Sequence, residues 1–343
     1  MARHRLAIIG LGMAVTPHAK SLIDLKDRAE IVCAFSPSEE RRRKFGERFP
    51  FPLVDDLERV WSDKTIGAVL ILTPPNTRLD LVRRAAEAGK HVLLEKPLEI
   101  TTARSLELVL ACRAGQVTLG IVLQHRFRPP ARKLREVLAA NELGRILGAS
   151  TAIRVWRPQS YYDQPGRGTR ARDGGGVLLT QAIHTLDLFL SLVGPPAEVT
   201  AHVTTTPVHR METEDLVSAL VRFRKGAFGA IEATTAAYPG YPERIEIIGQ
   251  KGCASIEGTG LKVALQDGRT FQIAPDESAG GTGVDPMAFP HDYHRELIAD
   301  FLDAIETGGT PRVTGEEALK VHFLIDALLE SGAKGRPVAV RES

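Results

Sequence analysis

The sequence has few cysteines, little net charge and no long apolar run. Cys33, Cys112 and Cys253 lie far apart in 343 residues, which excludes a disulfide framework and the paired spacing of a zinc site. The net charge is only +2, with both signs mixed along the chain, which argues against nucleic acid or an anionic membrane as a partner. No apolar run reaches the length of a membrane span. We therefore expect a cytoplasmic protein that binds small molecules and no metal.

The length and the apolar content predict two domains. A chain of 343 residues exceeds one usual core, and 43% hydrophobic residues suffice to fill two. Up to about residue 123, short β-rich runs alternate with helical patterns, which predicts a Rossmann domain at 1–123 with a doubly wound parallel sheet. Residues 124–343 are predicted to form an α/β domain with a large open, mostly antiparallel sheet. Successive strands over 197–271 and closing helices over 293–305 and 316–329 indicate this, and 278–283 is expected to be a mobile loop.

A glycine turn follows the first predicted strand. Leu6–Ile9 runs into Gly10-Leu11-Gly12-Met13-Ala14, where Gly10 permits a tight turn and Gly12 lets backbone amides approach a pyrophosphate at a helix N-terminus. Val15 stands where a third Gly or Ala is usual. The same residues also fit an ordinary turn between strand and helix, but their place at the start of a βαβ pattern favours a dinucleotide.

The end of the second predicted strand favours NADP over NAD. No carboxylate stands there to grip a ribose 2′-hydroxyl; instead Ser36, Ser38 and Arg41 offer hydroxyls and a guanidinium to a 2′-phosphate. Ser36 to Glu39 also reads as a helix capping box, and the two roles are compatible. The basic run 41–44 is interpreted as a solvated helix face.

Two further segments are expected beside the nucleotide, because ligands of open α/β sheets lie beyond the carboxyl ends of the strands. Thr73, Pro74 and Asn76 follow one strand and would line the nicotinamide side. Glu95-Lys96-Pro97 follows another, which makes Lys96 a candidate for proton chemistry, although a surface lysine before a loop is the alternative.

A glycine-rich segment in the second half carries the other candidate catalytic groups. Gly174–Gly176 precedes a helical pattern that places Thr180 and His184 four apart on one face, so the hydroxyl can orient the imidazole. Histidine suits proton exchange with an alcohol oxygen, although a hydrogen-bonded core histidine is the commoner reading. His291 to His294 lacks a third ligand motif and is interpreted as a helix start. Between the halves lie residues suited to a polyhydroxylated ligand, with Gln124 also beside the cofactor: Gln124, Arg126, Arg157, Tyr161 and Tyr162.

Taken together, the glycine turn, Glu95-Lys96-Pro97, Gly174–Gly176 with His184 and Asp187, and Asp300–Ile305 closely resemble the glucose-fructose oxidoreductase, inositol dehydrogenase and MocA (Gfo/Idh/MocA) family. The resemblance covers nearly the whole chain. It implies NAD or NADP, and hydride transfer to or from a hydroxyl-bearing carbon of a sugar or cyclitol. It also implies Lys96 near the nicotinamide, His184 as acid or base, and a homodimer or homotetramer built on the open sheet.

One departure and two alternatives accompany this interpretation. The family often has aspartate four residues before the histidine, where this chain has Thr180. A carboxylate-assisted histidine is therefore not expected, and Lys96 becomes the main catalytic candidate. The alternatives are a non-catalytic NADP-binding regulatory protein on the same scaffold, and a dehydrogenase of non-sugar alcohols or dihydrodiols.

Overall fold

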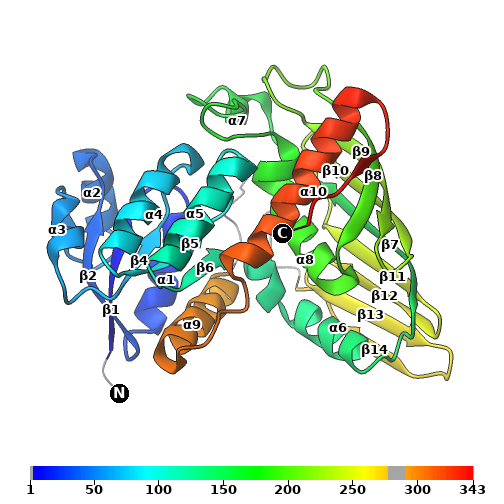
Figure 1. Ribbon diagram of the computed structural model, residues 1–343, viewed down its shortest axis with the longest axis horizontal. Helices are drawn as coiled ribbons and strands as arrows, with labels where there is room; N and C mark the ends of the chain where they lie inside the picture. Colours follow the sequence, from blue (N-terminus) through cyan, green and yellow to red (C-terminus); the bar gives the residue numbers. More distant parts are fainter. Residues whose placement is uncertain (1–2, 277–289, 343) are drawn as a thin grey trace. The chain divides into compact units, whose positions relative to one another are not determined.

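The computed structural model describes residues 3–276 and 290–342 (Figure 1). The chain divides into two compact units, unit 1 at Met1–Gln124 with Pro290–Ala318 and unit 2 at His125–Phe289 with Leu319–Ser343. The first boundary falls one residue from the predicted one. The predicted division differs in placing 290–318 in the second domain, because linear pattern reading does not detect a helix that returns to an earlier sheet. The loop expected at 278–283 lies outside the described residues.

Unit 1 is built on a parallel sheet of six strands in the order β3-β2-β1-β4-β5-β6. Its strands β1, β4, β5 and β6 are nearly continuous buried apolar runs, as expected where helices cover both faces. Helix α9 contacts α1, β5 and β6, so it belongs to this unit. The elements are β1 (His4–Ile9), α1 (Val15–Asp24), β2 (Ala29–Phe35), α2 (Glu39–Gly46), β3 (Leu53–Val54), α3 (Glu58–Ser62), β4 (Ala68–Ile71), η1 (Pro75–Thr77), α4 (Arg78–Glu87), β5 (His91–Glu95), α5 (Thr102–Ala114), β6 (Leu119–Val122) and α9 (Asp292–Thr307).

The register of this sheet places the candidate residues at one edge. Ile9 of β1 pairs with Ile71 of β4, and Ile71 pairs with Leu94 of β5. The segments that follow these residues therefore leave the sheet at the same edge. They begin at Gly10, Leu72 and Glu95, and they contain the glycine turn, the Thr73 loop and Lys96.

Unit 2 contains a nine-stranded sheet in the order β14-β13-β12-β11-β7-β10-β9-β8-β15, with only the β7–β10 pair parallel. Burial alternates along β9 and β11, as expected for a sheet with one covered face, and α8 contacts β7 and β11 while α6 contacts β12 and β13 (Figure 1). The elements are η2 (Gln124–Phe127), α6 (Pro129–Ala139), β7 (Ile146–Arg154), α7 (Gln159–Tyr162), η3 (Leu178–Ala182), α8 (Ile183–Val193), β8 (Pro196–Thr204), β9 (Leu216–Phe223), β10 (Phe228–Thr234), β11 (Arg244–Gly249), β12 (Gly252–Glu257), β13 (Gly260–Leu265), β14 (Thr270–Ile273), α10 (Gly315–Lys334) and β15 (Val338–Ala339).

The predicted fold class is confirmed: a doubly wound parallel sheet is followed by a large, mostly antiparallel one. Both closing helices also form where periodicity predicted them, as α9 and α10. Within residues 3–276 and 290–342, no helix combines the length and the apolar character that crossing a bilayer requires.

Candidate active site

The glycine turn has the geometry that the sequence predicts. Gly10 has φ of +105°, and a Cβ there would lie 3.0 Å from the carbonyl carbon of Leu72 and from the amide nitrogen of Thr73. At Gly12 a Cβ would meet no atom within 4 Å, so the backbone there is open to a ligand. Helix α1 begins at Val15, and its N-cap residue Ala14 provides no side-chain hydrogen bond to the first amides. These features fit a pyrophosphate at the start of α1.

The residues after β2 cap the N-terminus of α2, and the hydroxyl of a second serine supports that cap. Ser38, rather than Ser36, is the N-cap of α2, and its hydroxyl accepts the Arg41 amide at 3.4 Å. Ser36 is buried, and its hydroxyl accepts the Ser38 amide at 3.3 Å. The guanidinium nearest to this turn belongs to Arg42, which donates to the Ser36 carbonyl at 2.7 Å, while Arg41 is exposed. Arg42, which the sequence analysis interpreted as part of a solvated helix face, therefore bonds to the backbone of this turn.

The Thr73 loop lies at the edge of the sheet beside the glycine turn. Thr73 is half-buried, while Pro74 and Asn76 are exposed. The Thr77 hydroxyl donates to the Thr73 hydroxyl at 2.9 Å, which ties η1 to the end of β4. The exposed side chains of this loop are therefore held by a short turn that is bonded to the end of the sheet.

Lys96 follows β5 and is half-buried, and its backbone neighbours are held by a buried arginine. The guanidinium of Arg78 donates to the carbonyl of Thr73 at 2.9 Å and to the carbonyls of Glu95 and Pro97 on either side of Lys96. Burial lowers the pKa of Arg78 to about 10, which still leaves it a cation at neutral pH. Arg78 is thus bonded to the backbone on both sides of the candidate lysine.

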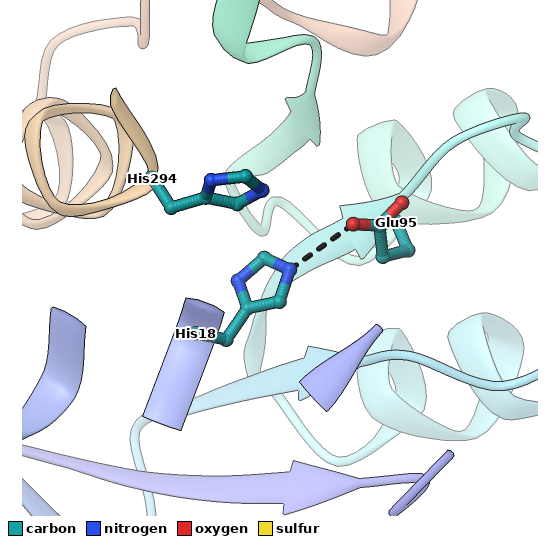
Figure 2. A group of neighbouring side chains, drawn as sticks. All are labelled: His18, Glu95 and His294. Atoms are coloured by element: carbon teal, nitrogen blue, oxygen red, sulfur yellow. Dashed lines mark hydrogen bonds and ion pairs between the residues drawn. The ribbon is translucent and has the colours of Figure 1, made fainter. Parts of the chain in front are cut away.

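Glu95 bonds to the backbone of Lys96 and to the ring of His18, and Figure 2 shows the Glu95 and His18 side chains with His294 beside them. Its Oε2 accepts the Lys96 amide at 2.9 Å, and its Oε1 lies 3.0 Å from Nε2 of His18 in α1. Burial raises the pKa of Glu95, but the hydrogen bond from His18 and the charges of Lys96 and Arg78 outweigh burial and leave the pKa below its usual value. His294 of α9 meets His18 edge-on, with ring centroids 4.9 Å apart. One ligand-type atom from each of His18, Glu95 and His294 lies within 4.8 Å of the others, all three residues being buried.

In unit 2 the glycine-rich segment is required by a close backbone approach. A Cβ at Gly176 would lie 1.8 Å from the carbonyl oxygen of Glu214, so only glycine fits. The carboxylate of Glu214 in turn accepts the amides of Gly176 and Leu178 at 3.1 Å each. Burial raises the pKa of Glu214. The first amides of this helical segment therefore donate to the buried carboxyl group of Glu214, a contact that the sequence did not indicate.

Thr180 and His184 do not lie on one α-helix as predicted. Leu178–Ala182 forms a π-helical turn, η3, and α8 begins only at Ile183. A π-turn widens the helix and changes which side chains share a face. The Thr180 hydroxyl donates to the carbonyl of Gly176 at 2.6 Å, which is a helix-backbone contact. Whether Thr180 acts in catalysis stays a prediction.

The ring of His184 stacks on His125, with centroids 4.9 Å apart and planes 27° from parallel. Arg128 Nη2 lies 2.7 Å from His125 Nε2, and Arg128 also pairs with the carboxylate of Glu243 at 2.6 Å. Burial raises the pKa of Glu243, but the charge and hydrogen bond of Arg128 leave it lowered overall. His184 therefore packs on an aromatic ring that itself contacts a partly buried ion pair.

The predicted substrate residues divide by their surroundings. Arg126 is only 5% exposed and makes a bidentate pair with Asp187 in α8, at 2.7 and 2.6 Å. Tyr162 is buried and donates its hydroxyl to Thr235 at 2.9 Å, and burial raises its pKa. Tyr161 is half-buried, with the guanidiniums of Arg157 and Arg167 above its ring at 5.9 and 4.9 Å from the centroid. Binding of substrate by these side chains stays a prediction.

The structure thus gathers the predicted residues into one set in each unit. Gly10 to Ala14, Thr73 to Asn76, and Glu95 with Lys96 converge at the sheet edge of unit 1. His184 lies in unit 2 beside His125. The sequence reasoning missed the polar residues that support both sets, because most of their partners lie far away in the chain and no local motif marks them. His18, Arg78, His125, Glu214 and His294 are buried, and Arg128 and Glu243 are partly buried.

Comparisons with known proteins agree with this architecture. Residues 4–122 match the model of the oxidoreductase family with an NAD-binding Rossmann fold, and residues 131–255 match the Gfo/Idh/MocA C-terminal domain. Myo-inositol 2-dehydrogenase of Thermotoga maritima is 26% identical over 349 residues, covering 98% of this chain and 99% of the relative. 1,5-Anhydro-D-fructose reductase of Ensifer adhaerens is 30% identical over 318 residues, covering 91% of each.

A solved structure gives the same result. The WlbA dehydrogenase from Bordetella pertussis, determined in complex with NADH and UDP-GlcNAcA, superposes with a TM-score of 0.85 at 26% identity and covers 100% of both chains. The matched models, the relatives and this structure all agree with the resemblance predicted from the sequence. The chain belongs to the Gfo/Idh/MocA family of NAD-binding oxidoreductases.

Proposed function

We propose that the protein transfers a hydride between a nicotinamide cofactor and a hydroxyl-bearing carbon of a sugar or cyclitol. The observation that carries this proposal is the placement of Lys96 at the sheet edge that also holds the open glycine turn. Names of the similar proteins support the substrate class, since they are an inositol dehydrogenase and an anhydrofructose reductase.

The roles of the side chains follow from their chemistry. When bound, the nicotinamide supplies or accepts the hydride. Lys96 donates a hydrogen bond to the reacting oxygen and exchanges its proton, and His184 acts as the second proton carrier. Gly10, Gly12, Met13 and Ala14 would hold the pyrophosphate. The remaining cofactor contacts are assigned to Ser36, Ser38, Arg41, Thr73, Pro74, Asn76, Glu95, Lys96 and Gln124, and the substrate contacts to Lys96, Arg126, Arg157, Tyr161, Tyr162, Thr180 and His184.

Replacement of Lys96 tests this function. Lys96→Met should lower kcat by about 10²–10⁴-fold, the usual contribution of a positioned proton carrier, measured by absorbance of the reduced cofactor over a panel of cyclitols, aldoses and anhydro sugars. Cofactor binding, followed by fluorescence of the reduced form, should persist. Lys64→Met, at an exposed lysine of the same unit, is the control and should be silent.

The same panel separates the alternatives. Tight cofactor binding by the unaltered protein without turnover of any compound would favour a regulatory protein. Turnover of simple alcohols or dihydrodiols in place of sugars would replace the substrate class. A Lys96→Met variant with full turnover would remove Lys96 from the mechanism.

We also propose a preference for NADP over NAD. No carboxylate follows directly after β2, and the hydroxyls of Ser36 and Ser38 lie there with the guanidiniums of Arg41 and Arg42. A 2′-phosphate favours such donors, whereas a 2′-hydroxyl favours a carboxylate. Equal dissociation constants for the two cofactors would contradict the preference.

A homodimer or homotetramer is proposed on the open face of the sheet in unit 2. Leu220, Phe228 and Ile248 are 69%, 66% and 54% exposed on three different strands. The register places them on one face, because Phe228 and Ile248 both pair with Gly148 and Ala230 pairs with Leu220. Apolar side chains gathered on an exposed face are typical of subunit interfaces. A monomeric mass in solution would contradict this proposal, and a cytoplasmic location stays a prediction.

A further inference from the structure

We propose that Arg78, Glu95 and His18 are positioning residues that fix the backbone around Lys96. We call these three residues the Lys96 clamp. The inference rests on the proposed role of Lys96, which the clamp holds in place without touching the reacting atoms. These three buried residues of unit 1 would hold the Lys96 backbone in place, a role that the sequence motifs alone do not indicate.

Arg78 forms the first half of the clamp. Arg78 as a whole residue is 4% exposed. Its guanidinium donates to the carbonyls of Glu95 and Pro97, which flank Lys96. Through Nε it also donates to Thr73 at 2.9 Å. A guanidinium has five donors in one plane, so it joins the ends of β4 and β5 rigidly. The peptide units on both sides of Lys96 are therefore anchored to one buried group.

Glu95 and His18 form the second half. One carboxylate oxygen accepts the Lys96 amide at 2.9 Å, and the other lies 3.0 Å from Nε2 of His18. The two oxygens have different partners, so a turn of the carboxylate plane would strain both contacts. His18 is 0% exposed, and the edge of the His294 ring stands against it (Figure 2). His18 thus stops the carboxylate from turning away from the lysine amide.

The same three residues, His18, Glu95 and His294, suit a metal ion in ligand type, but two observations favour hydrogen bonding. Both oxygens of Glu95 already have partners from the protein. In addition, within residues 3–276 and 290–342 no group hydrogen-bonds to Nδ1 of His18. A metal-bound histidine almost always donates its second ring nitrogen to a partner that orients it. The Glu95 carboxylate is therefore already in use, and a metal bound through Nε2 of His18 would lack that orienting partner.

Positioning matters here because the reactive ammonium lies at the end of a flexible stem. The direction in which the stem leaves the chain is set by the backbone of Lys96, and a misplacement of about 1 Å at a reacting group costs about 100-fold in rate. Loosening the clamp should consequently lower turnover more than it lowers binding of the cofactor.

The test compares two histidines at opposite ends of strand β5. His18 bonds to the last residue of the strand, Glu95, and His91 is its first residue. His18→Ala removes the bond to Glu95 at the carboxyl end of β5. The control, His91→Ala, removes the bond from the Thr118 amide, 2.9 Å long, at the opposite end of the strand. Hydrogen exchange of the Lys96 amide is measured in both variants without substrate, together with kcat, KM and the cofactor dissociation constant.

We expect His18→Ala to speed exchange of the Lys96 amide by about tenfold, the value of one good hydrogen bond, and to lower kcat by about 10- to 100-fold with little change in KM. His18→Gln, whose amide can still donate to Glu95, should restore most of both. His91→Ala should change neither, although it lowers the melting temperature. If His18→Ala fails to fold, His18→Phe, which keeps a ring but has no donor for Glu95, gives the same comparison in exchange.

Two results would overturn the clamp. The first is a Lys96 amide that exchanges at the wild-type rate in His18→Ala, or equally fast in His91→Ala. The second is one zinc ion per chain after dialysis of the wild-type protein against zinc and then buffer, lost in His18→Ala. Failure of the proposed function is distinguishable, since it would show as absence of turnover in the wild type while the exchange measurement still decides the clamp.

Discussion

The two units hold their candidate catalytic groups by different means. In unit 1 the contacts reach the backbone of Lys96, through the Glu95 carboxylate and the Arg78 guanidinium. In unit 2 they reach the side chain itself, since the His184 ring stacks on His125. A lysine has a long rotatable stem, whereas an imidazole is useful only when its plane is oriented. For Lys96 the contacts fix the backbone from which the side chain leaves. For His184 they fix the plane of the ring, which decides where its nitrogens point.

The units also differ in how they bury a cation. The guanidinium of Arg78 donates to the backbone carbonyls of Thr73, Glu95 and Pro97. Arg126 instead makes a bidentate pair with Asp187, whose side chain is 1% exposed. A buried carboxylate is costly without its partner, whereas a carbonyl remains neutral. Removing Arg126 should therefore be the more damaging change for stability.

Of the substitutions considered, Arg126→Met should change the stability of the protein most. It leaves Asp187 charged and buried, which should lower the free energy of unfolding by about 3–5 kcal/mol in a urea titration. Arg154→Met is the matched control, because Arg154 forms a bidentate pair with Glu232 at side-chain exposures of 44% and 36%. That pair should contribute no more than about 1 kcal/mol.

The double variant Arg126→Met with Asp187→Leu shows whether the loss of stability comes from the Asp187 carboxylate that has lost its bidentate partner. It should recover much of the lost stability, because replacing both partners of a buried pair with apolar groups is often nearly neutral. An Arg126→Met variant as stable as Arg154→Met would mean that Asp187 is not an isolated charge in the fold. It would also free Arg126 for the predicted contact with substrate.

The sequence predicted those parts of the fold and site that local patterns encode. The glycine turn, the strand edge at Lys96 and the helix at 292–307 depend on neighbouring residues, so periodicity and spacing suffice to find them. The same holds for the order of parallel and antiparallel regions. The glycine run indicated that this segment is special, but the contact of Gly176 with the Glu214 backbone was not predicted.

The supporting residues could not be predicted in this way. His18 and Glu95 are 77 positions apart, and Arg126 and Asp187 are 61 apart, so no spacing connects them. The π-turn at Leu178–Ala182 was also missed, because its residues have ordinary helical spacing. Burial decides these features, and burial follows from tertiary packing, which a single sequence does not display.

His125 sharpens the contrast between backbone and side-chain positioning. His125→Ala removes the ring beneath His184, and kcat should fall by about tenfold, since an aromatic pair contributes about 0.5–1.5 kcal/mol beyond its buried area. His125→Phe keeps a ring and should retain most of kcat, although Arg128 loses the Nε2 acceptor. Steady-state kinetics with the best sugar of the panel provide the measurement.

Equal losses in the two His125 variants would point to the contact with Arg128 in place of the stack. No loss in either would show that His184 needs no aromatic support. In both cases the exchange rate of the Lys96 amide should stay unchanged, because the clamp lies entirely in unit 1.

The smallest expected effect concerns the pH dependence of the ion pair that Arg128 makes with Glu243. The pKa of Glu243 lies below its usual 4.5 in the folded protein, since Arg128 outweighs the effect of burial. A lowered pKa in the fold means that the ionised group stabilises the protein above the usual value, and that this stabilisation is lost as the pH falls through the folded value.

Glu243→Gln measures that contribution directly. The difference in the free energy of unfolding between wild type and Glu243→Gln should be largest near neutral pH and should shrink as the pH falls below 4.5, because protonated Glu243 resembles glutamine. Glu257→Gln, at an exposed position of β12, controls for the loss of a carboxylate and should show a much smaller difference. A Glu243→Gln difference that stays constant from neutral to acidic pH would show that the charge of Glu243 contributes nothing. The electrostatic part of the support for His125, and through it for His184, would then be removed from the account.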